Sequence, residues 1–435
     1  MIEFLRHPLL KLRSHLALAG LVLGLAVLGS AVAGLHLWKQ YHLNAAHQAL
    51  DRYAFAEAQY HLNRCLAVPF RDGDLSLLAA RTARRCDCYQ EAARHLAACQ
   101  QQMGTTKVVT LERLLLAAQQ GELEAAEGLL SGDRGGEDPE SVLLLEALAK
   151  GYYLRSWRAE ARACLNKLLD LQPEHPQALL LRARVRQEMN PGGDAEPEAD
   201  ALRDYDKALS AISSFEAQLG RAGALYRLGR PWDALRQYEE LRLPGESDAP
   251  VLLGLARCRY SLGEVDAARR LLDELLQRHP DQWDAFLERG RLELHAGQAA
   301  EAEKWLRRAV FFAPHCEIGP LRSLGQCLQS QHKDEEARRC FARLDRTQAE
   351  LLQVDLLTMQ ANRDPSNVAL RYDIADKLMR LGRPRDSVAA LYHVLDQQPR
   401  HGPAHAALAD YFERLGQADL AARHRHAAAQ TTPAR

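Results

Sequence analysis

A regular internal repeat is the feature that most constrains how this chain can fold. The segment 263–268 (Gly-Glu-Val-Asp-Ala-Ala) is followed one period later by the segment 297–302 (Gly-Gln-Ala-Ala-Glu-Ala), and a second helical pattern after each ends at Pro280 or Pro314. The same period separates Pro399 from Pro433. A period of this length, about 34 residues, indicates an array of helical hairpins, each of which buries its apolar face only against its neighbours.

The period divides the chain into eleven units with first residues near 39, 73, 107, 142, 176, 215, 249, 283, 318, 368 and 402. Position 20 of every unit, counted in the fifth unit with its second helix shifted by an insertion, is small: Ala58, Ala92, Ala126, Ala161, Ala201, Ala234, Ala268, Ala302, Ala337, Ser387 and Ala421. Position 8 is also small, except at Leu114: Ala46, Ala80, Ala149, Ala183, Ala222, Ala256, Gly290, Gly325, Ala375 and Ala409. Two antiparallel helices approach closely only where facing residues are small, so these positions predict the seam inside each hairpin.

Larger apolar residues at position 24 are expected to fill the contact with the next unit: Leu62, Leu96, Leu130, Leu165, Tyr205, Tyr238, Leu272, Leu306, Phe341 and Leu391. The chain is rich in Ala, Leu, Arg and Glu, which favour helices, and it lacks the alternation of β-branched residues that strands need. The predicted fold class is therefore all-α.

This pattern resembles the tetratricopeptide repeat family, whose motif has small residues at positions 8 and 20, an aromatic residue or leucine near position 24 and proline at position 32. The resemblance covers roughly residues 39–433. It implies a solenoid, a right-handed superhelix whose concave face binds peptides or partner proteins. As a whole, the chain looks like the membrane-anchored tetratricopeptide proteins of bacterial envelopes.

Two segments interrupt the period. Residues 190–200, rich in Pro, Gly and acidic residues, are predicted to form a loop inserted in the fifth hairpin. Residues 346–366 add about half a unit and are expected to form an extra or extended helix that kinks the solenoid. Repeat units 1–9 then occupy residues 39–345, and units 10 and 11 occupy residues 367–435.

The N-terminal region carries an apolar run that predicts a transmembrane helix. Residues 16–37 contain no formal charge, and a run of this length can cross a bilayer as a helix. We expect a basic segment at 1–15, a signal anchor at 16–38 and interfacial aromatics at Trp38 and Tyr41. The alternative is a cleaved signal peptide ending near Ala33, which would release the protein into the periplasm or outside the cell.

The charges around this run predict its orientation. Arg6, Lys11 and Arg13 precede it and only Lys39 follows closely, which favours a cytoplasmic N-terminus and repeats outside the cytoplasm, on the inner membrane. The nine cysteines fit a reducing compartment slightly better. The reversed topology, with repeats facing the cytosol, therefore stays open.

The sequence offers few residues for chemistry. Cys86 and Cys88 flank one hairpin turn, but no further ligand is spaced to complete a tetrahedral metal site. Within one unit, His315 with Cys316, Cys327 and Cys340 supplies metal-ligand types, although cysteine is also a common small core residue. No phosphate loop, nucleophile elbow or His-Glu-x-x-His motif occurs. We expect no catalysis, no cofactor and no metal.

The resemblance assigns the partner-binding groove to positions 2, 5, 9, 12 and 13 of the first helices. The candidate groove residues carried by positions 9, 12 and 13 are basic or tyrosine: Arg81, Arg84, Arg85, Lys150, Tyr153, Arg184, Tyr226, Arg227, Arg257, Tyr260 and Arg291. Guanidinium groups pair with carboxylates at two points, so an acidic peptide or C-terminal carboxylate is the expected ligand. The alternative is that arginine is simply frequent here and these faces are solvated.

The formal net charge of −1 gives no reason to expect nucleic acid binding, and the oligomeric state cannot be read from the sequence. The leading hypothesis is a scaffold or adaptor that binds partner proteins during assembly of a cell-envelope complex. A regulatory subunit of an envelope-polymer, secretion or proteolysis machine is the alternative. Repeats alone do not distinguish the two, because this kind of fold hosts many functions.

Overall fold

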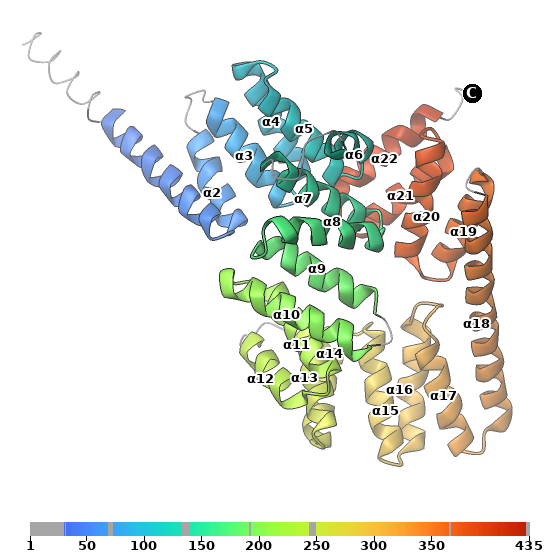
Figure 1. Ribbon diagram of the computed structural model, residues 1–435. Helices are drawn as coiled ribbons and strands as arrows, with labels where there is room; N and C mark the ends of the chain where they lie inside the picture. Colours follow the sequence, from blue (N-terminus) through green and yellow to red (C-terminus); the bar gives the residue numbers. More distant parts are fainter. Residues whose placement is uncertain are drawn as a thin grey trace, which may run out of the picture. The chain divides into compact units, whose positions relative to one another are not determined.

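The computed structural model describes residues 30, 32–67, 73–131, 139–190, 193–242, 249–364 and 367–431. Regular secondary structure within these ranges is helical throughout and includes no strand (Figure 1). The all-α prediction is therefore confirmed. The chain divides into two compact units, Met1–Leu116 and Ala117–Arg435, each of which is described by itself.

The first unit contains a helix over residues 32–51, followed by α2 (Phe55–Leu66), α3 (Gly73–Arg85), α4 (Tyr89–Met103) and α5 (Lys107–Gln119), which continues into the second unit. The second unit continues with α6 (Glu124–Ser131), α7 (Pro139–Leu154), α8 (Arg158–Leu171), α9 (Pro176–Glu188), α10 (Ala195–Ala211), α11 (Phe215–Arg227), α12 (Pro231–Leu241), α13 (Ala249–Ser261), α14 (Val265–Arg278), α15 (Trp283–His295), α16 (Ala299–Phe312), α17 (Ile318–Ser330), α18 (Asp334–Arg363), α19 (Val368–Arg380), α20 (Pro384–Gln397), α21 (Gly402–Arg414) and α22 (Ala418–Thr431). First helices begin at 73, 107, 176, 215, 249, 283, 318, 368 and 402, the residues where the repeat period places a new unit.

Small residues form the seam of each hairpin. The position 20 residues of all the units are between 0% and 1% exposed. A Cβ added to Gly290 at position 8 would lie 2.6 Å from Cγ of Leu306, and one on Gly325 would lie 2.7 Å from Cζ of Phe341. Position 8 thus receives the position 24 side chain of its own hairpin, so a larger residue there would force the two helices apart.

Glycine sets the hairpin turns in the regular repeats. Gly263 and Gly297 have φ angles of 81° and 76°, in the left-handed region that residues with a Cβ rarely adopt. The amide of Gly263 donates to the carbonyl of Tyr260, and that of Gly297 donates to the carbonyl of Leu294. The first helix therefore ends with a left-handed cap that turns the chain directly into the second helix.

The inserted loop is shorter than predicted. Helix α10 begins at Ala195, so residues 195–200 are helical and only the segment after α9, up to Asp194, connects the two helices. Two acidic residues in the first turn, Glu196 and Glu198, favour this start because they face the positive end of the helix dipole. Proline at 197 is tolerated because it lies in the first turn, where amides lack intrahelical partners.

The second interruption is a continuation of one helix. Helix α18 spans 30 residues, from Asp334 to Arg363, without a break. Its C-terminal half packs through Val354 and Ala361 against Ile374, Leu378 and Leu381. The added residues thus pack against apolar side chains of α19, in the next unit. Helix α19 follows at the C-terminal end of the long α18 (Figure 1).

The predicted transmembrane segment spans residues 16–38. Most of it, residues 16–29 and 31, lies outside the described part of the chain. Of that segment, residues 32–38 are helical. Across the ranges that the structure describes, no helix combines the length and apolarity needed to cross a membrane.

Within the second unit, repeats that are distant in sequence meet. The ring of Trp157, between α7 and α8, stacks on His393 of α20 with centroids 4.3 Å apart. Arg155 donates from Nη1 to Oδ1 of Asp396 at 2.7 Å, and its guanidinium also covers the ring of Tyr392. Helices α20–α22 accordingly lie beside α6–α8 (Figure 1). We call these contacts the closing contacts, because they connect the two ends of the second unit.

Candidate functional site

The candidate groove residues contact the neighbouring repeat in a regular manner. Tyrosine at position 12 reaches position 13 of the following unit three times: Tyr153 donates to Oε1 of Glu188 at 2.8 Å, Tyr226 lies 3.3 Å from Oγ of Ser261, and Tyr260 contacts Nδ1 of His295. In sequence these partners are always 35 residues apart. These contacts join three pairs of successive first helices: α7 to α9, α11 to α13 and α13 to α15.

Arginine at position 9 pairs with a carboxylate at position 6 of the next unit. Nε of Arg81 donates to Oε1 of Glu112 at 2.8 Å, and Nε of Arg257 donates to Oε1 of Glu288 at 3.0 Å. Arg84 also donates to Glu112, at 3.2 Å, but its side chain is only 2% exposed. Arg84 therefore stabilises the interior of the first unit and is not on an accessible surface.

The most open set of candidate groove residues lies on α13 and α15. Arg257, Arg291 and Tyr260 surround Glu288, with Nη1 of Arg291 at 3.8 Å from the same Oε1 atom that Arg257 contacts. The side chains of Arg257 and Arg291 are 37% and 41% exposed. Two cations thus share one carboxylate, which leaves a net positive charge on this surface. We call it the Arg257–Arg291 cluster.

A second set meets around Glu188 at the end of α9. Besides Tyr153, this carboxylate accepts from Nε of Arg158 at 2.9 Å and from Nη1 of Arg385 at 2.7 Å, while Arg184 lies 3.8 Å away. Burial alone would raise the pKa of Glu188, but the hydrogen bonds from Tyr153 and Arg158 and the nearby positive charges hold it below its usual range. Because Arg385 comes from α20, this set belongs to the closing contacts.

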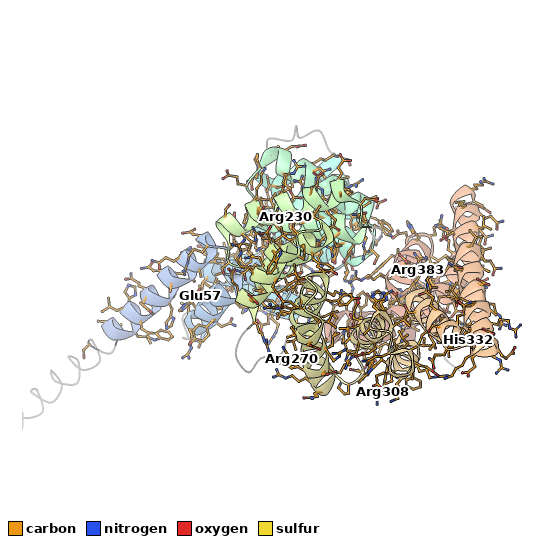
Figure 2. The ribbon with its side chains drawn as sticks, turned by 90° about the horizontal axis from the view of Figure 1, so that it is seen from below. Glu57, Arg230, Arg270, Arg308, His332 and Arg383 are labelled. Carbon is orange, nitrogen blue, oxygen red and sulfur yellow. The ribbon has the colours of Figure 1, made fainter. Side chains whose placement is uncertain are left out.

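The remaining candidate groove residues have different surroundings. Arg227 donates to Oε1 of the buried Glu198 at 2.7 Å, and Arg184 also contacts Glu216. Arg85 lies over the ring of Phe55, with 5.4 Å from its Cζ to the ring centroid. Lys150 is half-buried on α7. Intramolecular pairing extends beyond this set, since Arg230 pairs with Asp233 and Arg383 with Asp386. Figure 2 labels both arginines.

Sequence reasoning missed the carboxylates that occupy these arginines. Glu112 and Glu288 both lie 31 residues after a position 9 arginine, a spacing that places them on the facing side of the next first helix. Comparing position 9 with position 6 of the next unit would have found both. The contacts of Glu188 with Arg385 and of Trp157 with His393 have no such periodic signal, because they connect repeats far apart in the array.

The cysteines and histidines do not assemble into a metal site in the part of the chain that the structure describes. There, no group of three or more His, Cys, Asp or Glu side chains is placed to hold an ion. Cys65, Cys99, Cys258 and Cys327 are buried free thiols, and Cys88 lies at the turn between α3 and α4. Cys316, in the loop before α17, donates to the carbonyl of Gly382 at 3.4 Å.

The helical hairpins, their small-residue seams and their repeat-to-repeat ladder define a helical repeat protein of the kind that serves as a protein-interaction scaffold. Two stretches, residues 253–315 and 347–429, match family models described as tetratricopeptide repeat. These two stretches of the chain therefore carry tetratricopeptide repeats.

Similar proteins share only part of this chain or a low identity. Protein CTR9 homolog of Arabidopsis thaliana is 32% identical over 122 residues, which are 27% of this chain and 11% of that relative, so the chain spans a small part of its length. Among solved structures, the type IV pilus biogenesis factor PilW is 20% identical, with a TM-score of 0.40, over 48% of this chain and 93% of PilW. YrrB, described as a TPR protein with an unusual peptide-binding site, is 20% identical, with a TM-score of 0.35, over 46% of this chain and 98% of YrrB.

Proposed function

We propose that this protein is a scaffold that binds a partner protein through the Arg257–Arg291 cluster and acts by binding rather than by catalysis. The observation that carries this proposal is the sharing of Glu288 by two half-exposed arginines beside Tyr260. Each guanidinium has five N–H donors, and one carboxylate with two oxygens cannot use them all. The unused donors suit a carboxylate from a partner.

Tyr260 supports the same proposal. Tyrosine provides rigid contact area with few rotatable bonds, and tyrosine and arginine are enriched among the residues that contribute most to binding at protein interfaces. Arg257 and Arg291 are half-exposed and share one carboxylate, so the partner contact is expected over α13 and α15 rather than along the whole array. An acidic segment or a C-terminal carboxylate remains the ligand that this chemistry favours.

We propose further that residues 16–38 anchor the scaffold in the inner membrane and that the repeats lie outside the cytoplasm. The uncharged run and the three preceding cations support this placement. Assembly of a cell-envelope complex follows as the proposed role, with regulation of an envelope-polymer, secretion or proteolysis enzyme as the alternative.

Partner capture by the full chain from its native cells tests the proposal. The double variant R257A/R291A removes both cations, and R162A/R270A removes two exposed arginines of second helices that have no ion pair among the described residues. Charge-assisted hydrogen bonds contribute about 1.5–3 kcal/mol each, so we expect R257A/R291A to reduce capture at least about tenfold. The control should retain the captured proteins.

A third variant reverses the direction of the effect. Glu288→Gln removes the carboxylate that competes for both guanidiniums, so capture of an acidic partner should rise while the shape of the surface is kept. Unchanged capture by R257A/R291A, or reduced capture by E288Q, would contradict binding of an acidic partner at this cluster.

A further inference from the structure

A cavity of about 440 Å³ lies where α18 passes α19, at the break in the repeat period. We call it the α18–α19 pocket. Its charged lining consists of His315 from the loop after α16, Arg343, Arg346 and Glu350 from α18, and Lys377 and Arg380 from α19. The other lining residues are polar or aliphatic. Four permanent cations therefore face one carboxylate, even when His315 is neutral.

The loop that supplies His315 is fixed against the α19–α20 turn. Cys316 donates to the carbonyl of Gly382 at 3.4 Å. Gly382 has a φ angle of 78°, and a Cβ there would lie 3.0 Å from Cβ of Pro314, so glycine is needed for this approach. The pocket is thus built from α18 and from two segments that α18 separates in sequence, the loop after α16 and the end of α19.

The cations of the α18–α19 pocket differ from those of the candidate groove because most of them lack a partner. Among the described residues, Arg343, Arg346 and Lys377 form no ion pair, whereas Arg257 and Arg227 are bound to carboxylates of the chain itself. Arg380 pairs with Asp376 of its own helix at 2.7 Å. Cations on separate helices that face a shared cavity repel one another, and an incoming anion would relieve this repulsion.

We propose that the α18–α19 pocket binds an acidic segment of a partner protein, with at least two carboxylates beside one aliphatic residue. Arg343 and Arg346 supply planar forks for carboxylates, and Lys377 faces them from the other helix. Val354 and Leu381, which also line the pocket, provide apolar contact for the aliphatic residue. The proposal rests on the proposed function only in requiring a protein partner.

The dimensions favour a peptide over a single small anion. From Arg343 to Val354, α18 rises by about 16 Å at 1.5 Å per residue. An extended peptide covers that length with about five residues. A cavity of about 440 Å³ is also within the range of sites that take ligands of many atoms, roughly 300–1,000 Å³.

Fluorescence anisotropy with an amidated, fluorescein-labelled Glu-Glu-Leu-Glu-Glu peptide tests this on the full chain. The double variant R346E/K377E should weaken binding at least about tenfold, because two attractive contacts become repulsive. The matched control R162E/R270E changes the net charge equally at exposed sites, and Arg270 of α14 lies well away from α18 (Figure 2). It should bind the peptide within about twofold of the unaltered chain, in line with a small screened effect at long range.

Three outcomes would overturn the proposal. R346E/K377E and R162E/R270E could weaken binding equally, which would mean attraction by overall charge. The Gln-Gln-Leu-Gln-Gln peptide could bind as well as the acidic one, which would exclude carboxylate recognition. Inorganic pyrophosphate could displace the peptide at concentrations below the Kd of the peptide, which would identify a small-anion site. Unaltered helicity and melting of R346E/K377E, and the milder R346Q/K377Q, separate loss of binding from loss of folding.

The same variants distinguish this proposal from the proposed function. If R346E/K377E still captures partners while the peptide fails to bind, the pocket proposal is wrong and the Arg257–Arg291 cluster stands. If the peptide binds the pocket while R257A/R291A captures partners normally, the pocket proposal stands and the cluster does not bind the partner.

Discussion

Enlarging the seam at Ala302 should destabilise one hairpin specifically. Ala302 is 0% exposed, and its carbonyl oxygen lies 3.3 Å from the position that a Cβ on Gly290 would occupy. Ala302→Leu adds three carbon atoms where α15 and α16 are already in contact. Overpacking of this kind costs about 1–3 kcal/mol. At roughly 2–4 °C per kcal/mol for a domain of 150–250 residues, Tm should fall by about 2–12 °C.

The matched control is Ala300→Leu, two residues earlier on the exposed side of α16. Leucine is nearly as good a helix former as alanine, so this change should cost only a few tenths of a kcal/mol. Circular dichroism melts of both variants measure the difference, and hydrogen exchange shows whether it is confined to α15 and α16. Equal shifts at the two positions would refute the packing argument, because they would show that burial at position 20 does not limit side-chain size.

Trp157→Ala should weaken the closing contacts, because it removes the ring that stacks on His393. Backbone amide hydrogens of α20–α22 should then exchange faster with solvent, whereas those of α12–α14 should exchange at an unchanged rate. Trp232→Ala, at a tryptophan that is 66% exposed, is the control, and equal exchange in both variants would mean that Trp157 does not hold the ends together. For the membrane proposal, a reporter that is active only outside the cytoplasm, fused after Arg435, should be active, whereas activity of a cytoplasmic reporter there would reverse the topology.

Seam positions could be predicted from the sequence because they obey one local requirement repeated at every hairpin. Ala268 and Ala302 occupy the same place in consecutive units, and the constant period makes the requirement visible without knowledge of the fold. The sequence overestimates the length of the inserted loop, because the Pro, Gly and acidic content of residues 190–200 indicates a loop although Pro197 and the acidic residues near it lie in the first turn of α10, where proline is accepted.

The candidate site was only partly predictable. The repeat register identifies Arg257 at position 9. Whether this cation is available to a partner depends on the residue that faces it from the next repeat. That residue, Glu288, lies at position 6, which is not a groove position of the family. The closing contacts could not be predicted at all. Asp396 meets Arg155 across 241 residues of sequence, so the contact depends on the accumulated geometry of every repeat between them.

This dependence limits how the chain can change its length. In an open array of repeats, a hairpin can be duplicated or deleted and the remaining interfaces are kept. Here an added hairpin between α9 and α19 would carry His393 and Asp396 away from Trp157 and Arg155 by the displacement of a whole repeat. The number of hairpins in the second unit is therefore fixed by contacts between its ends, as the number of blades is fixed in a closed propeller.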